Sequence, residues 1–326
     1  MLCGLNDMNK NVIEYIQEIK SRQRFKYIYG EFHGRISDMR SAFNVLPHKE
    51  FLRYFPLSLV ALLETSCRML IAELIDSGEP YISRSKELMD KQKIDFEVMK
   101  HLYGKKITMG EFIAHSVAIN KLESIDRIFT TLLDKKLLQV LPSHINRWSV
   151  EVEKKDPQPM IQNSVEMYTC IKEIFEIRHI LAHESAMNIE LENVKIEQAI
   201  VLFGEFLEVL NDYIRDVMYP DQPLTQMDMN MSACDDLTKT LDSIEAIDSE
   251  IVRQISDKWI ERLEYYKRAH ESWKKYMEDN SEFEASSFIG GSMWTLIKAS
   301  SANRIALERE KDLKLLLNQL EENDFC

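Results

Sequence analysis

Apolar residues recur every three or four positions along most of the chain, which is the spacing expected of a buried helix face. A short apolar stripe lies within residues 12–19, and a longer one runs from Leu57 to Leu74. Alternation of apolar and polar residues, which would indicate strands, is scarce. The pattern therefore predicts an all-α protein.

Local signals predict where several of these helices begin and end. Thr108 and Glu111 form a capping box that is expected to start one helix, and residues 125–140 are predicted to form another. Two longer helices are predicted over residues 160–183 and 194–219. Because their connection is short, these two are expected to pack antiparallel.

The chain has 326 residues, which is more than a single domain usually contains. Pro220 and Pro223 interrupt the helical pattern, because a proline and the residue before it are both unfavourable in a helix. The sequence therefore predicts a larger helical domain over residues 1–220 and a smaller helical domain over residues 221–326.

Composition restricts the class of protein. Nine glycines and eight prolines fit a folded protein with long helices, and the five widely spaced cysteines contain no C-x-x-C pair. Reduced, mostly buried thiols are therefore expected, without a disulfide framework. No apolar run approaches the length of a membrane span, and the N-terminus turns polar too early for a signal peptide. We expect a cytoplasmic protein without membrane association.

The net charge of −13 is unevenly divided, with −9 in residues 221–326 and −4 in residues 1–220. Nonspecific coating of nucleic acid is disfavoured, because phosphate binding depends on clustered lysine and arginine. A local basic site remains compatible with this balance.

The segment ending at His183 carries the strongest chemical signal. His179 and His183 are four residues apart on one helical face, and Arg178 extends along the same side. Imidazole groups can move protons near neutral pH, while a guanidinium can stabilise the charge that develops on a phosphate. The inward face of this helix is predicted to consist of Ile171, Ile174, Phe175, Leu181 and Ala182.

The sequence from Arg178 to His183 resembles the R-x4-H motif of the HEPN superfamily, including the polar residue that often follows the arginine. The resemblance covers about residues 10–220 and implies a HEPN-type helical bundle. It also implies a metal-independent endoribonuclease without a cofactor, usually acting as a homodimer. Arg178 and His183 would be the catalytic pair and His179 would support them. The ribose 2′-hydroxyl would attack phosphorus, so DNA should be spared.

Alternative interpretations of the motif remain open. Arg178 could pair with a core acid such as Glu64, and the histidines could simply border a helix end. His179 and His183 also have the spacing of a zinc pair, although no third ligand is evident. Toxins silenced by nucleotidylation carry tyrosine two positions after the final histidine, whereas this chain has Ser185, which disfavours an adenylylating antitoxin.

A basic and aromatic segment near the N-terminus is a candidate RNA contact. Aromatic residues within 25–32 alternate with cations, a mixture that binds phosphates and stacks bases. A solvated helix end followed by a core-packing loop is an equally good interpretation. The candidate RNA-binding residues are Lys20, Arg22, Arg24 and Lys26.

Residues 224–326 resemble the LprI-like domain (DUF1311), named for a lysozyme inhibitor. The matching residues are Gln226, Met229, Asn230, Ala233, Cys234, Leu263, Ala269 to Trp273, Tyr276, Gly290 to Ser292, Arg304 and Leu307. Secreted members of that family carry several cysteines, and this copy keeps only Cys234 among them. A disulfide-stapled inhibitor is therefore not expected, and a sensor or regulator is.

Together the two resemblances imply a HEPN-type ribonuclease that is a toxin or an antiphage defence effector, with the LprI-like domain as sensor or regulator. The implied partners are an RNA substrate, a second copy of the chain, and an antitoxin or trigger protein. The alternative is a non-catalytic helical protein that dimerises and binds a nucleotide or a protein partner.

Overall fold

The computed structural model describes residues 3–22, 29–45, 49–89, 96–104, 107–184 and 189–321. Across these ranges every regular element is a helix, and the β pairing is confined to an isolated bridge between Ile145 and Pro159. The all-α prediction is confirmed. The chain divides into two compact units, Met1–Asp221 and Gln222–Cys326, which are described separately.

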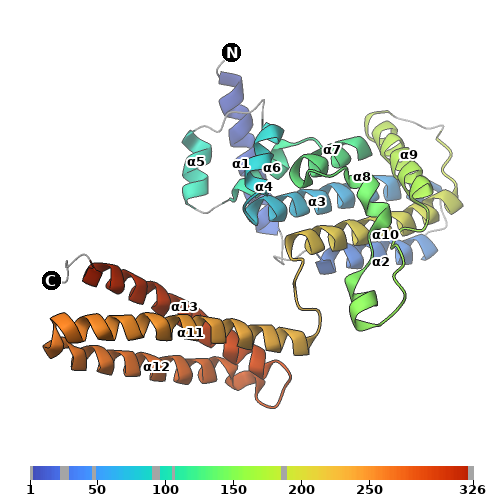
Figure 1. Ribbon diagram of the computed structural model, residues 1–326. Helices are drawn as coiled ribbons and strands as arrows, with labels where there is room; N and C mark the ends of the chain where they lie inside the picture. Colours follow the sequence, from blue (N-terminus) through green and yellow to red (C-terminus); the bar gives the residue numbers. More distant parts are fainter. Residues whose placement is uncertain are drawn as a thin grey trace. The chain divides into compact units, whose positions relative to one another are not determined.

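The first unit is arranged around the long apolar helix α3, Tyr54–Asp76, which packs against α2, α6, α9 and α10 (Figure 1). Its eleven buried side chains give it contact with neighbours on several sides. The other helices of this unit are α1 (Cys3–Arg22), α2 (Tyr29–Val45), α4 (Tyr81–Arg84), α5 (Phe96–Tyr103), α6 (Met109–Ser116), α7 (Leu122–Leu133), α8 (Leu137–Val140), α9 (Ser164–His183) and α10 (Asn193–Met218), with short 3-10 or π turns at Lys49–Arg53, Ser85–Met89, Leu141–Ser143 and Trp148–Val152.

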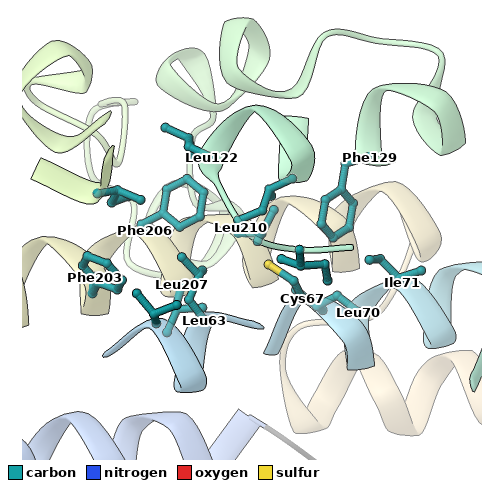
Figure 2. Packing of buried hydrophobic residues seen from close by; sticks show 14 of the residues in the cluster. Leu63, Cys67, Leu70, Ile71, Leu122, Phe129, Phe203, Phe206, Leu207 and Leu210 are labelled. Atoms are coloured by element: carbon teal, nitrogen blue, oxygen red, sulfur yellow. The ribbon is translucent and has the colours of Figure 1, made fainter. Parts of the chain in front are cut away.

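The centre of this unit is formed where α3, α7 and α10 meet. Figure 2 shows Cys67 of α3 beneath Phe129 of α7, with Leu210 of α10 beside them. All three side chains are fully buried. Burying an aliphatic or aromatic side chain of this size contributes about 1.5–3 kcal/mol, so this junction holds the helices that position α9.

The segment Lys49–Asp76, which contains α3, is long and apolar enough by length and composition alone to cross a membrane. This differs from the expectation that no segment approaches that length. More than half of its most apolar window (56%) is buried inside the protein, as in the core helix of a soluble protein.

Several helix ends differ from the predicted ones for identifiable local reasons. The helix predicted over residues 125–140 ends at Leu133, because Asp134 adopts a left-handed conformation with φ 57° before α8 begins. The helix predicted from residue 160 begins at Ser164, where the Asn163 side chain accepts a hydrogen bond from the backbone of Glu166. The predicted capping box of Thr108 and Glu111 is confirmed in both of its hydrogen bonds.

The second unit consists of α11 (Gln226–Lys258), α12 (Leu263–Ala285) and α13 (Trp294–Glu321). Both α11 and α12 pack along α13, and α11 and α12 contact each other less. A second capping box, formed by Thr225 and Asp228, starts α11. The central hydrophobic cluster of this unit is small, and its buried members are Ile244, Ile251, Ile255, Ala306, Leu313 and Leu320.

Three cysteines have described side chains, and all three are free thiols. Cys67 is buried and Cys170 is half-buried, and burial raises the pKa of Cys170 to about 11. Cys234 is exposed. The expectation of a buried thiol is therefore right for Cys67 and wrong for Cys234.

Candidate functional site

The last turns of α9 carry the three residues of the motif. The buried residues of this helix, Met167, Ile171, Ile174 and Phe175, all lie before the motif. Beyond them α9 emerges from the core, so His179 and His183 are exposed and Arg178 is partly exposed. The prediction that Ala182 faces inward is wrong, because this part of the helix has left the core and Ala182 is exposed.

Arg178 contacts an acid of the central helix. Its Nη2 atom donates to Oε1 of Glu64 on α3 at 3.4 Å, and the two side chains are 33% and 23% exposed. This distance is long for a hydrogen bond between charged groups, which is usually 2.7–2.9 Å. A guanidinium has five N–H donors, and this contact uses one of them. The alternative expectation that Arg178 pairs with Glu64 is therefore confirmed, while the arginine keeps a solvent-accessible part.

The charges of two guanidinium groups act on Glu64. Burial raises its pKa, and the positive charges of Arg178 and Arg68 act in the opposite direction. Arg68 is itself engaged with the backbone oxygens of Ala114 and Val117, at 2.5 and 3.2 Å. The net effect of burial is to make Glu64 easier to protonate, which weakens its hold on Arg178.

His179 and His183 lie side by side on the exposed end of α9. Their ring centroids are 4.8 Å apart and the rings are tilted by 56°. His183 is the last residue of the helix, and a protonated imidazole there interacts favourably with the final backbone carbonyls. Within the residues that the structure describes, no third imidazole, thiol or carboxylate completes a metal site with these two histidines.

Of the four candidate RNA-binding residues, only Lys20 has a side chain that the structure describes. Lys20 lies near the end of α1, where its ammonium group is 2.7 Å from Oε1 of Glu111 on α6. Arg22 ends α1, but its side chain lies outside the described residues, as do Arg24, Lys26 and Ser185. Lys20 is thus partly neutralised by Glu111, and this weakens its case as a phosphate contact.

A hollow of about 360 Å³ lies between α9 and the segment that enters α10. Its apolar lining includes Ile174, Ile177 and Ile196. Its charged lining is mainly acidic: Glu166, Glu173, Glu190 and Glu192 are opposed only by Lys195 within this lining. Negative charge of this kind repels phosphate, so the hollow is not a suitable binding site for an RNA backbone.

The second unit contains a larger cavity, of about 720 Å³, between α11, α12 and α13. Leu241, Trp273 and Met277 contribute to its apolar lining. His270 is buried in its wall, with Nδ1 3.2 Å from Oδ1 of Asp248, which also accepts a 2.6 Å hydrogen bond from the hydroxyl of Tyr266. Its volume falls within the range of small-molecule sites.

Two of the residues that carry the LprI-like resemblance are brought together in space. The side-chain amide of Asn230 on α11 donates to the backbone oxygen of Ser292, which precedes α13, at 3.1 Å. Trp273 packs against the core of this unit, and the Arg309 guanidinium carbon lies 5.9 Å from the centroid of its ring. These residues therefore have a structural role in joining the three helices.

No protein-family model, curated protein or solved structure matches this chain. The two family resemblances therefore depend on the residues quoted for them.

Proposed function

We propose that the chain is a metal-independent endoribonuclease of the HEPN type, in which Arg178 and His183 act on the scissile phosphate and His179 supports them. The observation that carries this proposal is the exposed end of α9, where a partly accessible guanidinium lies next to two exposed imidazoles with ring centroids 4.8 Å apart. Such a group combines a fixed positive charge with two groups able to exchange protons.

In the proposed reaction the ribose 2′-hydroxyl loses a proton and its oxygen attacks the adjacent phosphorus. The bond from phosphorus to the 5′-oxygen breaks, and that oxygen takes up a proton, leaving a 2′,3′-cyclic phosphate and a 5′-hydroxyl. His183 moves a proton, and Arg178 stabilises the additional negative charge on the phosphoryl oxygens in the transition state. Since DNA lacks the 2′-hydroxyl, it is not cleaved by this route.

Arg178 must turn from Glu64 towards the phosphate in this mechanism. The cost is small, because the contact is long and both side chains are partly exposed, and ion pairs of this kind contribute little net stability. A second copy of the chain would bring a second set of these side chains to the same RNA. We propose a homodimer for this reason.

We further propose that the enzyme acts in the cytoplasm as a toxin of the antiphage defence kind. The LprI-like unit would act as a sensor or regulator that responds to a trigger or an antitoxin. The 720 Å³ cavity between its three helices supports this role, because it is large enough for a small ligand.

The test is cleavage of total RNA by the purified full-length chain, with and without EDTA. We expect cleavage that survives EDTA, yields 2′,3′-cyclic phosphate ends, spares DNA, and is lost in Arg178→Ala and in His183→Ala. Lys172→Ala is the matched control, because it removes an exposed cation of the same helix that pairs with Glu123. Equal cleavage by the wild type and both motif variants would eliminate the proposal.

A regulated toxin can be silent after purification, so growth arrest on expression is the second assay. Arrest should be relieved by either motif substitution at unchanged protein levels and should persist with Lys172→Ala. Arrest that persists in both motif variants counts against catalysis.

The contact between Arg178 and Glu64 favours one other function, that of a non-catalytic helical protein that dimerises and binds a nucleotide or a protein partner. In that case Arg178 only neutralises a partly buried acid. Stable RNA and an unchanged growth phenotype in both motif variants would support it.

A further inference from the structure

A second group of polar side chains lies on the first unit, where the segment between α8 and α9 (green in Figure 1) passes the C-terminal part of α10. His144 belongs to this segment, and Asp212 and Asp216 belong to α10. The imidazole Nε2 is 2.9 Å from Oδ2 of Asp212 and 3.9 Å from Oδ2 of Asp216. One donor atom from each of the three lies within 4.8 Å of the others.

The two distances from His144 to the carboxylate oxygens are slightly shorter and slightly longer than the distance between two donor atoms on one metal ion. Zinc bonds to nitrogen and carboxylate oxygen are about 2.0–2.2 Å, so two donors on one tetrahedral zinc ion lie roughly 3.3 Å apart. The side chain of His144 is only 9% exposed and each aspartate is 27% exposed. The imidazole is therefore held by its surroundings, while the carboxylates remain accessible enough to adjust.

The charge of this group also favours a cation. Asp212 and Asp216 are one helical turn apart in the last two turns of α10, where the backbone carbonyls already present negative charge. Arg147, the guanidinium whose charge acts on Asp216, is itself paired with Glu151 at 2.8 Å. The two carboxylates therefore leave negative charge uncompensated.

We propose that His144, Asp212 and Asp216 bind one divalent transition-metal ion, which fixes the segment before α9 to α10. The ion would take Nε2 of His144 and one oxygen of each carboxylate, with water completing the coordination as at other three-ligand zinc sites. Any proton on Nε2 is released to the solvent when the ion binds. This role is structural and is independent of the proposed RNA cleavage.

The donor set indicates the class of ion. Calcium and magnesium prefer oxygen ligands alone, whereas an imidazole nitrogen together with carboxylates suits first-row transition metals. Zinc binds such a site more tightly than manganese. We therefore expect zinc to bind, manganese to bind more weakly, and magnesium to compete poorly.

The test is calorimetric titration of zinc into the metal-free full-length chain, with thermal unfolding in parallel. We expect one ion per chain and a rise of the Tm of the first unit by about 5 °C at a hundredfold excess of zinc over the Kd. His144→Ala and Asp216→Asn should each weaken binding at least tenfold. The matched control is Glu208→Gln, which removes an exposed carboxylate of the same helix and should leave binding unchanged.

The pair of His179 and His183 is the competing zinc site on this unit. His183→Ala should leave zinc binding intact if the proposal is right. The proposal is overturned if the wild type binds no zinc, or if His183→Ala removes binding while Asp216→Asn keeps it. Asp216→Asn preserves the shape of a partly exposed side chain, so its result does not depend on whether His144→Ala folds. RNA is absent from this titration, so a failure of the ribonuclease proposal leaves the outcome unaffected.

Discussion

We expect Arg178→Ala to lower the free energy of unfolding of the first unit by only about 1 kcal/mol. The arginine and Glu64 are 33% and 23% exposed, and their charged atoms are 3.4 Å apart. Exposed pairs contribute about 0–1 kcal/mol, while breaking a fully buried pair costs about 3–5 kcal/mol. The contact is long, and the positive charge of Arg68 still acts on Glu64 when Arg178 is removed. The contribution of this pair to stability should therefore be close to that of an exposed pair.

The effect on cleavage should be much larger. Removing one group that stabilises a developing oxyanion typically reduces the rate by about 10²–10³, which corresponds to roughly 2.7–4 kcal/mol in the transition state. A loss of about 1 kcal/mol in stability leaves a domain of ordinary stability folded, so unfolding cannot account for such a reduction. Comparing the two quantities in the same variant therefore separates catalysis from packing.

The assay is urea unfolding followed by far-ultraviolet circular dichroism, combined with RNA cleavage, for the wild type, Arg178→Ala, Glu64→Gln and the double variant. The cycle should give a coupling energy of at most about 1 kcal/mol. Both variants that lack the arginine should cleave RNA about 10²–10³-fold more slowly than the wild type. The reasoning is refuted if Arg178→Ala costs 3 kcal/mol or more and Glu64→Gln restores both stability and cleavage in the double variant, since the arginine would then only neutralise the acid.

Three further predictions concern the framework around the site. In Gly110→Ala the new Cβ would lie 2.3 Å from the backbone oxygen of Ala72, so we expect a loss of about 1–3 kcal/mol in urea unfolding, and an unchanged midpoint would refute the close packing of α6 on α3. Burial, together with a neighbouring guanidinium, lowers the pKa of His115 to about 4. The folded state thus takes up this proton less readily than the unfolded state, so stability should be constant above about pH 6.5 and fall towards pH 4, by at most about 3 kcal/mol. His115→Gln should flatten this pH dependence, and the same slope in that variant would contradict the assignment. Thr225→Ala removes the cap that accepts from the backbone of Asp228 and should cost the second unit about 1 kcal/mol, whereas Thr225→Ser should be nearly neutral.

Local signals predicted local structure well. The capping box of Thr108 and Glu111 involves backbone groups three residues apart, so nothing distant can override it easily. The continuation of a helix through residue 134 was predicted wrongly, because the apolar spacing resumes in α8 and hides the left-handed turn at Asp134. Aspartate is among the few residues that adopt this conformation readily. The aspartate at position 134 is therefore the sequence signal that could have predicted the end of the helix.

Long-range contacts were much less predictable. Glu64, the partner of Arg178, is 114 positions away, and nothing in the sequence distinguishes it from other acids that could face the core. The spacing of Asp212 and Asp216 is visible in the sequence, but His144 lies 68 positions before Asp212 and joins the pair only through the fold. Such juxtapositions depend on how helices pack, which residue periodicity does not specify.

The separation of the two hydrophobic clusters has a consequence for heating experiments. Among the described residues, the hydrophobic cluster within 222–326 has six buried side chains, and the cluster of the first unit is far larger. A single melting temperature is then a poor description of the whole chain, because each cluster can lose its order in its own transition. Calorimetry should record two peaks of heat absorption, with the smaller, earlier one belonging to the three C-terminal helices.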